Sequence, residues 1–92
     1  MVLTAESKSV NEVKPRNYDK RFICNSDFSE YSVETVVQIS EDSEQAVLTV
    51  WNDRDVVVNN KTFSVDLEGE EVRDVADWFD GFLLDKVNKY LK

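Results

Sequence analysis

The alternation of apolar and polar residues between positions 30 and 40 is the clearest structural pattern in the chain. One side of an extended backbone there would carry Tyr31, Val33, Thr35, Val37 and Ile39. Because strand side chains point alternately to two faces, this pattern predicts a half-buried β-strand. Shorter strands are expected at 21–24, 46–51, 56–58 and 62–67, and polar residues predict turns between them at 25–27, 41–44, 52–55 and 59–60.

The hydrophobic period changes to that of a helix from about Glu70 to the end of the chain. At about 100° per residue, one side of this helix collects Val72, Val75, Ala76, Phe79, Phe82, Leu83, Val87 and Tyr90. The stripe stays in phase through Gly81, which favours one long helix over two. A kink or break at Gly81 is the alternative, because glycine inside a helix costs about 1 kcal/mol relative to alanine.

These elements predict an α+β fold, with a small antiparallel β-meander of three to five strands packed against one long C-terminal helix. A sheet of this size needs such a cover to bury one of its faces. Residues 1–20 lack clear periodicity and contain Pro15, so we interpret them as an N-terminal arm or loosely packed lead-in. Residues 21–92 are expected to form a single acidic domain, because 92 residues suffice for only one.

Charge is the most unusual feature of the composition. The chain has 19 Asp and Glu against 11 Lys and Arg, for a net charge of −8. Residues 1–21 carry five bases and three acids, so the acidic excess belongs to residues 22–92. Such an excess disfavours direct binding to nucleic acid or to an anionic membrane and attracts basic protein surfaces. The alternative is that the charge only keeps a small protein soluble.

The residue types that most catalytic and metal sites require are scarce. The chain has no histidine, one cysteine (Cys24) and two glycines. These counts exclude Ser-His and Cys-His nucleophile pairs, a zinc site of several soft ligands and a glycine-rich phosphate loop. We therefore expect no enzyme, no cofactor and no bound metal, although paired carboxylates stay compatible with acid–base chemistry. Cys24, beside Phe22 and Ile23, is best interpreted as a small buried apolar residue.

The location expected from the sequence is the cytoplasm. No apolar run approaches the ~18–20 residues of a membrane span. The first six residues lack a basic stretch followed by a long apolar one, so we expect no secretory signal. A single cysteine also fits a reducing compartment. For a phage-encoded protein this compartment would be the cytoplasm of the host.

The candidate functional surface is the acidic face of the predicted helix with its flanks. Carboxylates at i, i+3 and i+4 of a helix lie ~5–6 Å apart and can present a row of negative charge; the alternative is a solvated outer face. Trp78 lies off the apolar stripe, as either a core-edge aromatic or an interface anchor. The predicted partner-binding residues are Glu68, Glu70, Glu71, Asp74, Asp77, Trp78, Asp80 and Asp85.

In its size, acidity, lack of histidine and α+β pattern, the chain resembles the small inhibitors that phages and plasmids make against host nucleases. These include anti-CRISPR and anti-restriction proteins, and the chain also resembles immunity proteins and antitoxins. The resemblance implies a non-enzymatic inhibitor that occupies the basic nucleic-acid-binding surface of a partner protein by mimicking nucleic acid. The alternatives are an immunity protein or antitoxin, and a small phage structural or assembly protein that self-associates, for example as a homodimer, with Leu84, Leu91 and Trp78 as the subunit contact.

Overall fold

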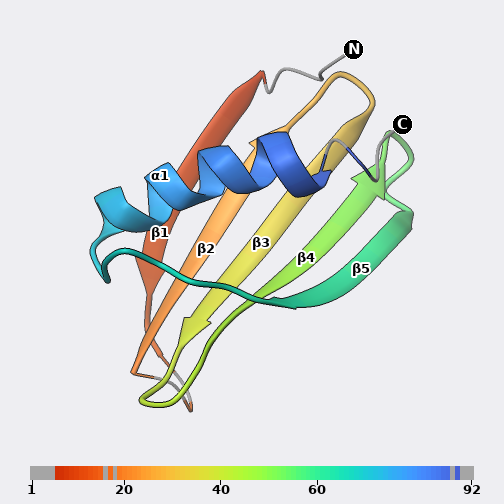
Figure 1. The fold of residues 1–92 in the computed structure, drawn as a ribbon. Coiled ribbons are helices and arrows are strands. Elements are labelled where there is room, and N and C mark those ends of the chain that lie inside the picture. Colours follow the sequence, from red (N-terminus) through yellow and green to blue (C-terminus); the bar gives the residue numbers. More distant parts are fainter. Residues whose placement is uncertain (1–5, 16, 18, 88, 90–92) are drawn as a thin grey trace.

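One antiparallel sheet and one C-terminal helix make up the fold. The computed structural model describes residues 6–15, 17, 19–87 and 89. Within them, each strand pairs with the next along the chain: β1 (Ser7–Val13), β2 (Lys20–Asp27), β3 (Tyr31–Ile39), β4 (Glu44–Asn52) and β5 (Val57–Ser64). The helix α1 (Val72–Phe82) continues directly into the π-helical segment η1 (Leu83–Val87). The predicted α+β class, with an antiparallel sheet and a C-terminal helix, is confirmed (Figure 1).

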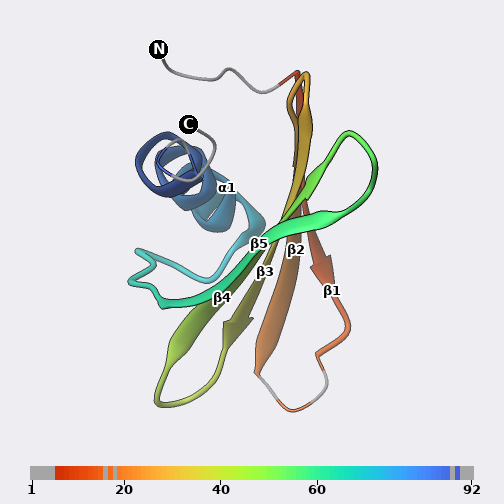
Figure 2. The ribbon, with the colours of Figure 1, turned by 90° about the vertical axis from the view of Figure 1, so that its right-hand side faces the viewer.

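The helix lies on one face of the sheet, and the core fills the space between them (Figure 2). The helical segment contributes Val75, Phe79, Phe82, Leu83 and Val87 to this core, as the apolar stripe predicted. Burying each such side chain contributes roughly 1.5–3 kcal/mol. The sheet contributes alternate residues from its central strands, led by Phe22, Cys24, Val33, Thr35, Val37, Ile39, Ala46, Leu48 and Val50.

The predicted core-facing side of the helix is wrong at its first residue. Val72, the first residue of α1, is 40% exposed, because it lies where the helix enters over the outer strand. Tyr90 and Leu91 lie outside the described residues. The helix runs without a break through Gly81, where an added Cβ would meet only open space. Gly81 therefore faces outward and does not interrupt the packing.

The interpretation of residues 1–20 as a loosely packed arm is corrected by β1, which pairs with β2 from Ser7↔Asp27 to Val13↔Arg21. An edge strand of this kind is held by backbone hydrogen bonds on one side and needs no apolar alternation. Its side chains are accordingly exposed, except for the partly buried Val10 and Val13. Hydrophobic periodicity carries little signal for a strand in which a face contributes only one partly buried valine, here Val10, to the core.

Two predicted turns are also wrong. Asn25, Ser26 and Asp27 continue β2, and the chain instead reverses just beyond them, where Phe28 N–H donates to the Tyr31 carbonyl at 2.8 Å. The expected turn at positions 59–60 lies inside the continuous strand β5. Asn60 keeps its place in the sheet, and its side-chain amide donates to Thr49 Oγ1 at 3.0 Å. Tertiary pairing thus overrides the local turn preference of asparagine.

Candidate functional site

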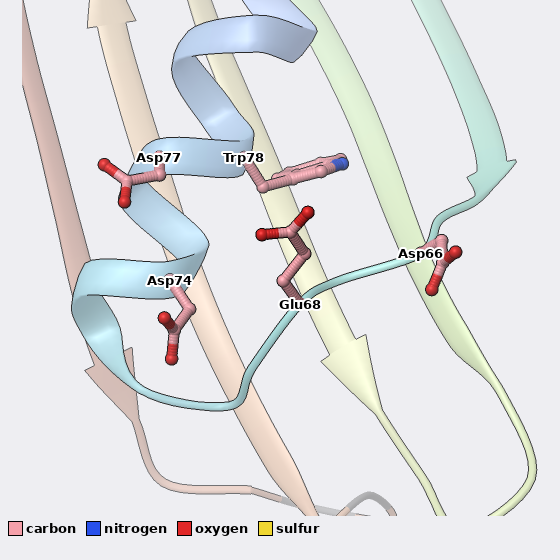
Figure 3. Close-up of a pocket in the computed structure, with 5 residues that line it drawn as sticks. All are labelled: Asp66, Glu68, Asp74, Asp77 and Trp78. Atoms are coloured by element: carbon pink, nitrogen blue, oxygen red, sulfur yellow. The ribbon is translucent and has the colours of Figure 1, made fainter.

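The segment that joins β5 to α1, residues 65–71, runs beside the helix and encloses a small acidic cavity. The cavity has a volume of about 260 Å³. Figure 3 shows Glu68 pointing toward the indole of Trp78, with Asp66 across from it and Asp74 and Asp77 on the helix. Four acidic residues and one tryptophan therefore line the cavity, and the Asp77 carboxylate points away from Glu68 and Trp78.

A second hollow of about 450 Å³ continues along the same flank of α1. It shares Asp66, Asp77 and Trp78 with the first and adds Asp85 and Lys86 farther along the helix. We call the two hollows together the acidic groove. Its charged residues are the carboxylates of Asp66, Glu68, Asp74, Asp77 and Asp85 and the single ammonium group of Lys86.

Trp78 is held in the groove by aromatic contacts that reach into the core. Its ring stacks on Phe82 with centroids 4.8 Å apart and planes at 27°. Phe82 in turn meets Phe63 edge to face at 5.5 Å and 78°. Aromatic pairs of this geometry contribute about 0.5–1.5 kcal/mol beyond the area that they bury. The indole is therefore fixed on one face by Phe82 and remains partly exposed in the groove.

Hydrogen bonds from the sheet position the segment that carries Asp66 and Glu68. Glu44, the first residue of β4, accepts Leu67 N–H on its Oε2 at 2.8 Å and Val65 N–H on its backbone carbonyl at 3.0 Å. The Leu67 side chain packs into the core, with only 9% of its surface exposed. The segment is thus tied to the sheet on both sides of Asp66.

The helix start fixes the position of Asp74. Glu71 is the residue before the first turn, and its N–H donates to Asp74 Oδ2 at 3.1 Å. A carboxylate in the first turn also interacts favourably with the helix dipole. A Cβ added at Gly69 would collide with the Asp74 carboxylate, so the absence of a side chain there lets segment and helix approach closely. Asp74 therefore has a structural role as well as a place in the groove.

The structure divides the predicted partner-binding residues into two groups. Glu68, Asp74, Asp77, Trp78 and Asp85 line the acidic groove. The others do not: they are Asp80, Glu70 and Glu71.

Asp80 lies on the opposite flank of α1, where it forms an ion pair with Lys8 of β1. Glu70 and Glu71 are exposed near the helix start, and the backbone carbonyl of Glu70 accepts a hydrogen bond from Lys20 Nζ at 3.1 Å. The prediction missed Asp66, which lies two residues beyond the end of β5. The expected strand at 62–67 included Asp66, whereas β5 ends at Ser64 and leaves Asp66 in the segment that precedes the helix.

The other candidate chemistry lies away from the groove. Cys24 is fully buried, and burial raises the pKa of its thiol from 9.0 to about 12. It is thus protonated at neutral pH, which does not suit a nucleophile. Among the described residues, no group of three or more Cys, Asp and Glu side chains is arranged to hold a metal ion.

Comparison with known proteins gives no relative: no protein-family model, curated protein or solved structure matches the chain. In the part of the chain that the structure describes, no helical segment has both the length and the apolarity needed to cross a membrane.

Proposed function

We propose that this protein is a non-enzymatic inhibitor that binds the basic nucleic-acid-binding surface of a partner protein through the acidic groove. The observation that carries the proposal is the gathering of five acidic residues and a partly exposed indole along one flank of α1, with Lys86 as the only base among the described residues that line the groove. The partner would be a nucleic-acid-binding enzyme or complex, and the protein would act in the cytoplasm by taking the place of nucleic acid.

Charge gives this groove its preference for a basic partner. The chain carries a net charge of −8, so phosphate backbones are repelled and basic surfaces are attracted. The ion pair of Asp85 with Lys86 joins atoms 3.8 Å apart on exposed side chains and offsets little of the negative potential. Attraction of this kind speeds association and weakens as salt is added, because the Debye length is only about 10 Å at 0.1 M.

The indole adds a preference for arginine over lysine in the partner. A guanidinium can stack on an aromatic ring while its N–H groups donate to carboxylates in a planar fork. The small cavity offers both elements, since Glu68 points toward Trp78 and Asp66 lies across from them (Figure 3). An antiparallel meander packed on the helix would supply the rigid frame that this recognition requires, because a preorganised site loses less entropy on binding.

Partner capture with charge-matched variants tests the proposal. The groove variant combines Asp66→Asn, Glu68→Gln and Asp77→Asn, and the control variant combines Glu6→Gln, Glu30→Gln and Asp53→Asn. The control acids are exposed and line neither hollow of the groove, so both variants lose three negative charges and only one of them changes the groove. Immobilised wild type should retain a basic nucleic-acid-binding protein from a host lysate and release it at moderate salt.

The groove variant should bind this captured protein at least about tenfold more weakly, while the control stays within about threefold of wild type. Equal losses in the two variants would show that only net charge matters. Full retention by the groove variant would place the binding surface elsewhere. Either result would refute the proposal that the acidic groove binds the partner.

A structural or assembly role is the second candidate. It is favoured by apolar side chains at the surface, because Leu84 is 61% exposed and Val56, Val57 and Val58 are each at least 50% exposed. The three valines are consecutive at the start of β5, and exposed apolar patches often mark contacts between proteins. Recovery of only the protein itself in the capture experiment would favour this role over inhibition.

A further inference from the structure

The face of the sheet opposite the helix carries no other element of the described chain. Figure 2 shows α1 and the segment 65–71 on one side of the strands, with no described helix or strand over the other side. Strand register assigns 20 side chains to this open face, four from each strand. They form four rows that cross all five strands, because residues paired between strands point to the same face.

The open face differs from the rest of the protein in its charge. Arg21, Asp27 and Glu34 are the three charged residues among its 20 positions, whereas 33% of the whole chain is charged. Its net charge is thus −1 in a chain of −8. Asp27 accepts a hydrogen bond from Ser7 Oγ at 3.0 Å within the same face. Depletion of charge is typical of the centre of a protein–protein interface.

The centre of the open face is an apolar row. Ile23, Val36 and Val47 lie side by side on β2, β3 and β4. Trp51 and Val57 form a second apolar pair at one end of β4 and β5, and Val57 is 50% exposed. Most of the remaining positions are Ser, Thr, Asn and Gln, which can pair with copies of themselves. A β-branched centre with uncharged polar surroundings is suited to pack against another sheet.

We propose that the open face is the interface of a homodimer, in which two copies of this chain pack sheet against sheet. Charge favours a second copy as the occupant. Two molecules of −8 repel each other at most orientations, and contact through the open face keeps both acidic grooves on the outside. The contact would be related by a two-fold axis, because the same patch serves both partners.

The size of the face is sufficient for a modest dimer. Five strands at ~4.8 Å and about seven residues at ~3.3 Å give roughly 24 by 23 Å. This corresponds to on the order of 550 Å² per copy and about 1,100 Å² in total, near the lower bound of about 1,000–1,200 Å² for specific interfaces. We therefore expect the dimer to have a dissociation constant between about 1 μM and 1 mM.

Salt separates this proposal from the proposed function. Added salt screens the repulsion between two acidic molecules, so it should strengthen the dimer. The same salt should weaken binding of a basic partner to the acidic groove, because that contact is attractive. The dimer uses the opposite face of the sheet and does not depend on the groove, so either idea can fail alone.

Sedimentation equilibrium of the full chain tests the proposal directly. Over about 1 μM to 1 mM, wild type should rise from the monomer mass of 10.7 kDa toward twice that value, at lower concentration in high salt. Val36→Lys and Val47→Lys place like charges at the centre of the interface and should weaken the dimer at least about tenfold. Leu84→Lys makes the same change on the helical side and should leave it unaffected.

The proposal is overturned if wild type stays monomeric throughout this range, or if Leu84→Lys dissociates the dimer while the two valine variants do not. Circular dichroism identifies any variant that fails to fold.

Trp51 gives a second readout that needs no charged variant, because it lies on the open face and Trp78 does not. In Trp78→Phe, the emission of Trp51 should shift to the red on dilution; in Trp51→Phe, the emission of Trp78 should stay constant. No shift in the first variant would also count against the dimer.

Discussion

The carboxylate of Glu44 holds the segment that brings two acids into the groove, so its removal should be costly. Its Oε2 accepts Leu67 N–H at 2.8 Å in a partly buried position. Glu44→Ala leaves this amide without its acceptor at the edge of the core. The bond between Val65 N–H and the Glu44 backbone carbonyl is unaffected by the substitution, so the change isolates the side-chain contact.

The expected loss follows from the type of bond. A hydrogen bond to a charged group contributes about 1.5–3 kcal/mol net, and partial access of water to this one places it near 1.5–2 kcal/mol. In a domain of this size each kcal/mol lowers Tm by about 4–8 °C, so Glu44→Ala should melt roughly 6–16 °C below wild type. Glu44→Gln keeps an oxygen acceptor and should lose about half as much free energy of unfolding.

Urea and thermal unfolding followed by circular dichroism measure these differences. Glu41→Ala is the matched control, because Glu41 is exposed in the turn just before β4. It should change the free energy of unfolding by no more than about 0.5 kcal/mol. Wild-type stability in Glu44→Ala, or an equal loss in Glu41→Ala, would refute the assignment of Glu44 as the anchor of the segment.

Other substitutions test the packing of the helix and the state of the thiol. Phe79→Ala, at a side chain 1% exposed, should lose about 3–5 kcal/mol and leave much of the protein unfolded by circular dichroism. Gly69→Ala should destabilise by about 1–2 kcal/mol in urea unfolding, because the new Cβ meets the Asp74 carboxylate, whereas Gly81→Ala should stabilise by about 0.5–1 kcal/mol. The native thiol of Cys24 should resist a thiol reagent at pH 8 and react once urea unfolds the chain. Burial raises its pKa from 9.0 to about 12, so the folded state keeps a proton that the unfolded state loses, and stability should fall as pH rises above 9.0.

The sequence identified the elements that bury a face and missed those that do not. β3 and β4 follow the alternation that predicted them, because one side of each strand enters the core. β1 escaped detection because backbone pairing at the edge of a sheet places no demand on side-chain polarity. Asn59 and Asn60 predicted a turn because asparagine favours turns, but pairing with β4 keeps the chain extended at these positions.

The candidate site shows the same division. Proximity in sequence grouped Asp80 with the other acids, although it lies on the far flank of α1 against Lys8. That ion pair depends on β1, so it was invisible as long as residues 1–20 were interpreted as an arm. Asp66 was missed because its place in the groove comes from the path of segment 65–71, which Glu44 and Gly69 determine through contacts distant in sequence.

The proposed inhibition requires that the acidic groove occupy the nucleic-acid-binding surface of the partner. Its most direct test is a calorimetric titration of the captured partner, with and without saturating nucleic acid. We expect that nucleic acid abolishes binding, that salt weakens it, and that the groove variant binds at least about tenfold more weakly than the charge-matched control. Equal affinity for the free and the nucleic-acid-bound partner would contradict it, because the groove could not then be occupying that surface.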